Sequence, residues 1–123
     1  MEDYESAAIR HLKDAELLSH AGEFDNAGHL VGFAAECAIK HSIHTITGGA
    51  ARPHGHMPNF VVTARKHLNQ RSSMFDFLKQ DRLVGWDVNQ RYYRSGTVSE
   101  QHVSLWLSET KRLFACAKIR NRS

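Results

Sequence analysis

The segment from Phe24 to Thr47 constrains the fold most, because its apolar residues recur at helical spacing over more than one face. The residues of this pattern are Ala27, Leu30, Val31, Ala34, Ala35, Ala38, Ile39 and Ile43. A helix that is apolar over so much of its circumference is usually packed on several neighbours. Small residues such as Gly28 and Gly32 would let those neighbours approach closely. The sequence therefore predicts a central helix that ends at Gly48.

Two further segments carry an apolar stripe that suits helices packed against the central one. The first lies between about Asp3 and Ala21, and Gly22 provides a natural stop for it. The other begins at a capping box formed by Thr97 and Glu100. Its stripe consists of Val103, Trp106, Leu107, Thr110, Leu113, Phe114 and Ala117. We therefore expect one helix near each end of the chain.

The middle of the chain predicts two shorter helices separated by loops. Gly48 to His56 is a loop by composition, and Pro58 suits the first turn of a helix from Asn59 to about Asn69. A short amphipathic piece covers Met74 to Leu83, whereas Gly85 to Gly96 is irregular and aromatic. These segments predict a single all-α domain over residues 1–123. We expect an up-and-down four-helix bundle with an extra short helix.

Composition and charge fit one globular domain without a membrane span. The 123 residues are 41% hydrophobic and 24% charged, with a net charge of +3, which allows a phosphate-bearing partner. Cys37 and Cys116 lie far apart in apolar patterns, so we interpret them as free buried thiols in a reducing compartment. The acidic start does not resemble a signal peptide, and no apolar stretch approaches the roughly 18 residues of a membrane span. We expect a cytoplasmic protein.

Glu36 and Lys40 are charged residues in the middle of the apolar central segment. Their spacing of four residues places them on one helix face, where they can pair. Charges are costly in such a helix unless they are paired or line a groove. The pair could form the polar floor of a ligand cleft, or it could be an ordinary ion pair at the helix edge.

Histidines form a second group with possible chemistry. His41 and His44 share one helix, and His54 and His56 follow in the next loop. Four imidazoles could hold zinc or another transition metal, but no Cys or carboxylate joins them at a familiar spacing. We therefore favour a loop in which His54 and His56 bond to the backbone or cap a helix. We expect no metal and no other cofactor.

The loop from Trp86 to Arg94 combines aromatic and basic side chains. Trp86, Tyr92 and Tyr93 lie beside Arg91 and Arg94, so the loop could stack on bases and bind phosphates. Alternatively, Trp86 and Tyr92 could close the end of the core while Arg91 bonds to carbonyls or to a carboxylate. No other segment of the sequence has this mixture.

These motifs together resemble the HEPN family of prokaryotic helical domains over nearly the whole chain. The most specific part is the alanine-rich central segment that carries Glu36 and Lys40. The similarity continues through the His54-Gly-His56 loop to Trp86 and the Arg91-Tyr92 dipeptide. The resemblance implies a four-helix bundle, frequent homodimers and a role in nucleotide or RNA handling. Many members are metal-independent ribonucleases, found as toxins with a nucleotidyltransferase-like antitoxin or in phage defence.

Those ribonucleases share an Arg that is followed by a His after about four to six intervening residues. The Arg helps to hold the phosphate, and the His serves acid–base chemistry. Arg52 and His56 have only three residues between them, whereas Arg94 and His102 have seven. Neither spacing matches, so the resemblance does not assign a catalytic pair to this chain.

We therefore expect a HEPN-like module that binds nucleotide or RNA without cleaving it. The expected ligand-binding residues are Glu36, Lys40, His54, His56, Trp86, Arg91 and Tyr92. One alternative is a toxin-type endoribonuclease with a displaced pair such as Arg94 and His102. Another alternative is a structural adaptor for a partner protein, for example a nucleotidyltransferase-like one.

We predict a symmetric homodimer, because the central helix is apolar beyond one face and a lone bundle of this size has limited means to cover it. Light scattering should give about twice the chain mass of 13.9 kDa. A particle of the single-chain mass at high protein concentration would contradict this expectation.

Overall fold

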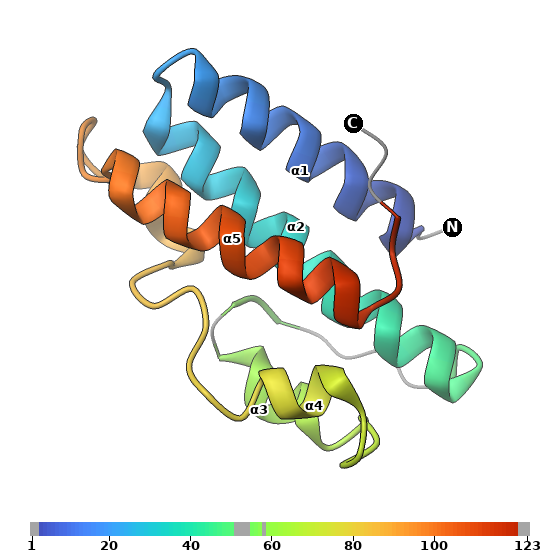
Figure 1. The fold of residues 1–123 in the computed structure, drawn as a ribbon. Helices are drawn as coiled ribbons and strands as arrows, with labels where there is room; N and C mark the ends of the chain where they lie inside the picture. Colours follow the sequence, from blue (N-terminus) through green and yellow to red (C-terminus); the bar gives the residue numbers. More distant parts are fainter. Residues whose placement is uncertain (1–2, 51–54, 58, 121–123) are drawn as a thin grey trace.

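The computed structural model describes residues 3–50, 55–57 and 59–120, except for the side chain of Arg91. Within these ranges the chain forms helices and no strand, which confirms the all-α expectation (Figure 1). The elements are α1 (Tyr4–His20), α2 (Phe24–Thr47), α3 (Phe60–Arg65), α4 (Ser73–Phe77), the 3-10 helix η1 (Val88–Tyr92) and α5 (Glu100–Cys116). None of the helices in the described ranges has the length and apolarity needed to cross a membrane.

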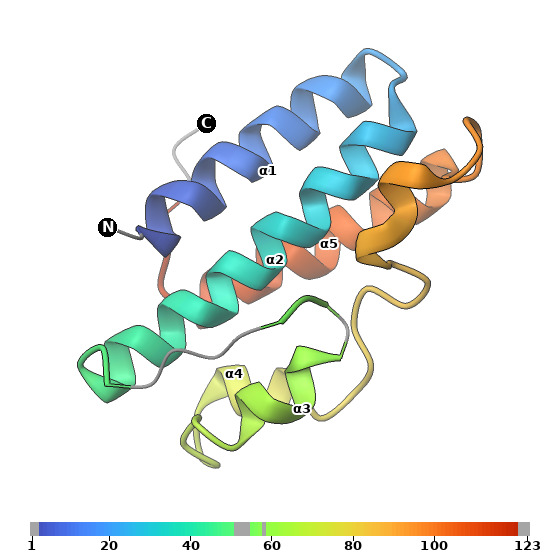
Figure 2. The same cartoon turned by 180° about the vertical axis from the view of Figure 1, so that it is seen from behind.

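The three long helices α1, α2 and α5 pack side by side. Figures 1 and 2 show α1 antiparallel to α2, and α5 along α2 in the same direction. The short helices α3 and α4 lie on the side of α2 and α5 that is away from α1. The bounds of α2 coincide with the predicted segment, and Gly48 ends it with a left-handed backbone at φ 61°.

The third helix is shorter than predicted: α3 ends at Arg65 instead of near Asn69. After Arg65 the backbone N–H groups of residues 66–68 bond three residues back instead of four, so the α-helix ends in tighter turns. Side-chain hydrogen bonds then order the break that follows. The Asn69 side-chain carbonyl accepts from the backbone N–H of Arg71 at 2.8 Å, and the Ser72 hydroxyl donates to the Asn69 carbonyl at 2.7 Å. Ser72 also accepts from the N–H of Phe75 and so starts α4.

The next piece, predicted for Met74 to Leu83, ends already at Phe77. The Arg82 side chain supplies a donor for the end of the helix, since its Nε–H bonds to the carbonyl of Phe77 at 2.9 Å. Leu83 has a positive φ of 52°, which a helix cannot continue through.

The last helix also starts differently from the prediction. Its N-cap is Ser99, and the capping box pairs Ser99 with His102 instead of Thr97 with Glu100. The Thr97 hydroxyl bonds to the carbonyl of Arg94. The carboxylate of Asp25 in α2 holds the approach to α5, because it accepts from the N–H groups of Gly96 at 2.7 Å and Val98 at 3.0 Å.

The two glycines in the first half of α2 receive the two tryptophan rings of the core. A Cβ atom on Gly32 would lie 1.8 Å from Cε2 of Trp86, and one on Gly28 would lie 2.9 Å from Cζ3 of Trp106. Both rings are 1% exposed. The indole N–H of Trp86 donates to the carbonyl of Gly28 at 2.8 Å. The expected close approach to α2 is therefore made by these two tryptophans.

Gly32→Ala should destabilise the fold, by about 1–3 kcal/mol for an overpacked core. In an ordinary helix the same exchange stabilises by about 1 kcal/mol, so the sign of the effect is diagnostic. Urea denaturation followed by circular dichroism measures it. Ser104→Ala on the exposed face of α5 is the matched control and should change stability by less than about 0.5 kcal/mol. A gain in stability for Gly32→Ala would show that Trp86 does not rest on Gly32.

Candidate functional site

Glu36 lies at the centre of the candidate site and is only 5% exposed on α2. Each of its carboxylate oxygens has a basic partner. Oε2 lies 3.1 Å from Nζ of Lys40, and Oε1 lies 2.9 Å from Nδ1 of His56. A buried carboxylate is costly unless both oxygens are satisfied, so these partners are a condition of its burial.

Lys40 is also mostly buried and connects the helix to the loop. The exposed fraction of its side chain is 12%, against 7% for that of Glu36. Its ammonium donates to the carbonyl of Gly55 at 3.2 Å and lies 5.5 Å from the ring centroid of Phe60. The pair is therefore not an exposed ion pair at a helix edge. It joins the loop of residues 55–57 to α2.

His56 is the member of this cluster that faces solvent, since half of its side chain is exposed (50%). Its Nδ1 is directed at Glu36, which leaves Nε2 on the opposite edge of the ring. A carboxylate at Nδ1 favours the tautomer with the proton on Nδ1, so Nε2 can accept a proton. When the ring is protonated, Nε2–H can donate to an anion. The bond to Glu36 thus fixes the orientation of the His56 ring and of its Nε2 edge.

A group of aromatic and imidazole rings lies next to the Glu36 cluster, and Phe33 of α2 is at its centre. The ring centroids of His56 and His11 each lie 6.0 Å from that of Phe33, and those of His29 and Trp86 lie at 4.7 and 5.8 Å. Sequence reasoning missed His11 and His29. For His29 a signal existed, because positions 29, 33, 36 and 40 recur at the spacing of one helix face.

Trp86 belongs to the core and offers no surface to a ligand. Besides its bond to Gly28, its ring stacks on that of His29 at 6.0 Å and 17°. The segment that follows is also more regular than predicted. It forms η1, where Asp87 accepts from the N–H of Asn89 at 2.7 Å and the Gln90 amide donates to the carbonyl of Gly85 at 2.9 Å. These local bonds supply the order that apolar periodicity did not predict.

The exposed part of the aromatic loop lies just after this anchor. Tyr92 is 75% exposed, Tyr93 is 48% exposed and Arg94 is also exposed. Of the predicted site residues, His54 and the side chain of Arg91 lie outside the part of the chain that the structure describes. Since η1 packs on α2, the loop that carries the exposed tyrosines and the Glu36 cluster are both attached to this helix.

In the displaced pair Arg94 and His102, the histidine has other partners. The imidazole Nδ1 of His102 lies 3.0 Å from the hydroxyl of Ser99 and 3.3 Å from its N–H, so this nitrogen serves the helix cap. The ring also stacks on Trp106 at 5.4 Å. No described hydrogen bond or ion pair joins the side chains of Arg94 and His102.

Of the histidines considered for a metal, His41 and His44 have different neighbours, and His54 lies outside the described residues. His41 lies 3.4 Å from a carboxylate oxygen of Glu5, and the ring of His44 lies 6.4 Å from that of Tyr4. Among residues 3–50, 55–57 and 59–120, no three His, Cys, Asp or Glu side chains are grouped closely enough to hold a metal ion.

His11 should titrate below its ordinary value of 6.5. Burial lowers the pKa of His11, and Arg10 lowers it further, against the opposing effects of Asp14 and Glu36. NMR of the imidazole resonances measures the midpoint. The folded state favours the neutral imidazole of His11. The stability that this group contributes is therefore present above pH 6.5 and is lost as the pH falls through the lowered pKa. His11→Gln should weaken this acid-side loss. A midpoint at or above 6.5 would contradict the partly buried placement.

Comparisons with known proteins supply no relative from which a function could be transferred. The chain matches no protein-family model, and neither the curated proteins nor the solved structures contain a match to it. The geometry of the Glu36 cluster and of the neighbouring loop is therefore the basis for proposing a function.

Proposed function

We propose that the chain is a HEPN-like module, a homodimer in solution, that binds a nucleotide or RNA without cleaving it. The observation that carries the proposal is the half-exposed imidazole of His56, fixed through Nδ1 by the buried carboxylate of Glu36. A positioned imidazole edge is a suitable contact for a phosphate oxygen. The second partner of Glu36, Lys40, is buried and satisfied, so its role is to hold the loop.

The exposed loop supplies the other chemistry that a nucleotide needs. Tyr92 and Tyr93 present rings on which bases can stack, and Arg94 adds a guanidinium group for a phosphate. Phe33 and the anchored Trp86 connect this loop to His56 along α2. Stacking rings near a phosphate contact are typical of single-stranded RNA recognition.

Exposed apolar side chains support the homodimer. Among the described residues, five large aliphatic side chains are more than half exposed: Leu17, Ile46, Val62, Val84 and Leu105. Their exposure means that the single chain leaves apolar surface in water, which a second copy could cover.

One observation also favours a second function, metal-independent RNA cleavage. A carboxylate that orients an imidazole is a common arrangement for a general base, and the base here would be His56 instead of His102. We prefer binding because the described residues place no arginine guanidinium in contact with His56 to hold the scissile phosphate.

A nucleotidyltransferase-like protein remains the proposed partner of such a module.

Removal of the His56 imidazole should weaken RNA binding, and it should also lower the stability of the fold by about 1–3 kcal/mol because Oε1 of Glu36 loses its partner. Circular dichroism therefore first checks that the variant is folded at the temperature of the binding measurement. His56→Ala should reduce affinity about tenfold, as for one lost charge-assisted hydrogen bond. Tyr92→Ala should cost about 1–3 kcal/mol of binding free energy for one lost stacking platform. Fluorescence anisotropy with a short single-stranded RNA measures both. Lys13→Ala, which removes an exposed cation from α1, is the control for charge alone and should bind nearly as the unchanged protein does.

The same samples separate the three functions. Cleavage of the RNA without metal, lost in His56→Ala, would replace the binding module with an endoribonuclease. Absence of both binding and cleavage would reject both and favour the structural adaptor.

A further inference from the structure

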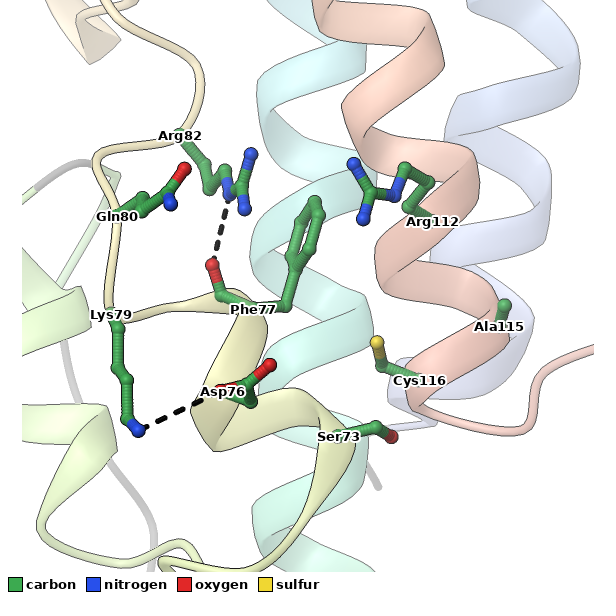
Figure 3. Close-up of a pocket in the computed structure, with 9 residues that line it drawn as sticks. All are labelled: Ser73, Asp76, Phe77, Lys79, Gln80, Arg82, Arg112, Ala115 and Cys116. Carbon is green, nitrogen blue, oxygen red and sulfur yellow. Dashed lines mark hydrogen bonds and ion pairs between the residues drawn. The ribbon is translucent and has the colours of Figure 1, made fainter.

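A second site lies in a polar hollow of about 570 Å³ between α4, the segment after it and the C-terminal half of α5 (Figure 3). The basic residues at this hollow are Lys79, Arg82 and Arg112, with Gln80 beside them. None of these residues belongs to the Glu36 cluster or to the aromatic loop. The hollow is therefore separate from the site proposed for RNA.

Arg82 is held firmly at the wall of the hollow. Its Nε–H donates to the carbonyl of Phe77, and its Nη1 lies 3.7 Å from a carboxylate oxygen of Glu109. The guanidinium carbon lies 3.7 Å from the ring centroid of Phe77. Only 15% of the side chain is exposed. Since a guanidinium has five N–H donors, further donors remain after these two contacts.

Arg112 approaches the same ring from α5. Its guanidinium carbon lies 4.6 Å from the ring centroid of Phe77, and Figure 3 shows the ring between the two guanidinium groups. Two cations on one ring repel each other, and an anion bound beside the ring would offset that repulsion. The planar donor forks also match the geometry of phosphate oxygens.

The local charges leave a cation available for a ligand. Glu109 pairs with Arg82, and Asp76 pairs with Lys79 at 3.6 Å. No acidic residue in the described part of the chain forms an ion pair with Arg112. The Asp76–Lys79 pair is open to water, with side-chain exposures of 79% and 57%, so Lys79 can exchange its partner for a ligand at little cost.

We propose that this hollow binds the phosphate group of a phosphomonoester beside the Phe77 ring, with Arg112 as its main contact and Arg82 and Lys79 as further cations. This site goes beyond the RNA-binding function and does not depend on it. A volume of about 570 Å³ exceeds what a bare phosphate needs and falls in the range of small-molecule sites. The ligand is thus a phosphate with an attached group, either a free small molecule or the 5′ end of an RNA.

Calorimetric titration with inorganic phosphate and with adenosine monophosphate tests the site. Arg112→Gln should weaken both about tenfold, because it removes one charge-assisted contact. Arg10→Gln on α1 removes an exposed arginine elsewhere and should leave both affinities within about twofold, since an exposed charge contributes little at a distance. Arg112→Lys keeps the charge but not the planar fork, so it should bind with intermediate affinity and serves if the Gln variant does not fold.

The two ligand sources are separated by 5′-phosphorylated and 5′-hydroxyl forms of one RNA. A preference for the phosphorylated form that Arg112→Gln abolishes supports the RNA end, whereas binding of adenosine monophosphate without that preference supports a free phosphomonoester. Equal affinity of Arg112→Gln and the unchanged protein for every phosphate probe would overturn the proposal. Tighter binding of succinate than of phosphate would also overturn it.

Discussion

The structure depends on the contact between the indole of Trp86 and Gly32 of α2. With a Cβ distance of 1.8 Å, no side chain at position 32 could coexist with this ring, and the bond from the indole N–H to Gly28 adds direction to the packing. Trp106 uses Gly28 in a similar way from α5. These contacts bring the aromatic loop and α5 against one face of α2. The segment that carries the exposed tyrosines follows Trp86 directly, so this contact attaches it to α2.

The functional proposal depends on a second feature of the same helix, the buried carboxylate of Glu36. It joins α2 to the loop of residues 55–57 through one oxygen to His56 and indirectly through Lys40 to Gly55. Burial of an acid in an apolar helix costs free energy that only these partners offset. The three side chains therefore depend on one another for their positions. Because Nδ1 of His56 is bonded to Glu36, the opposite edge of the ring is the one that can meet solvent.

The sequence predicted those features that depend on residues close together in the chain. The bounds of α2 followed from its apolar period and from Gly48, and the spacing of Glu36 and Lys40 predicted their pairing. The short helices were overestimated, because the backbone turns to bonds of three-residue spacing after Arg65, and the Arg82 side chain bonds to the carbonyl of Phe77 at the end of α4. His56 and Glu36 are twenty residues apart, and His11 comes from another helix. Such contacts exist only once the helices pack, so sequence spacing could not reveal them.

The central claim, that Glu36 fixes His56 with Nε2 outward, is tested most directly by the tautomer of His56. Long-range ¹H–¹⁵N NMR distinguishes the two ring nitrogens in the neutral imidazole. We expect the proton on Nδ1, bonded to the carboxylate, and an unprotonated Nε2. A neutral ring with its proton on Nε2 would contradict the claim, because Nδ1 would then have no hydrogen to donate to Glu36.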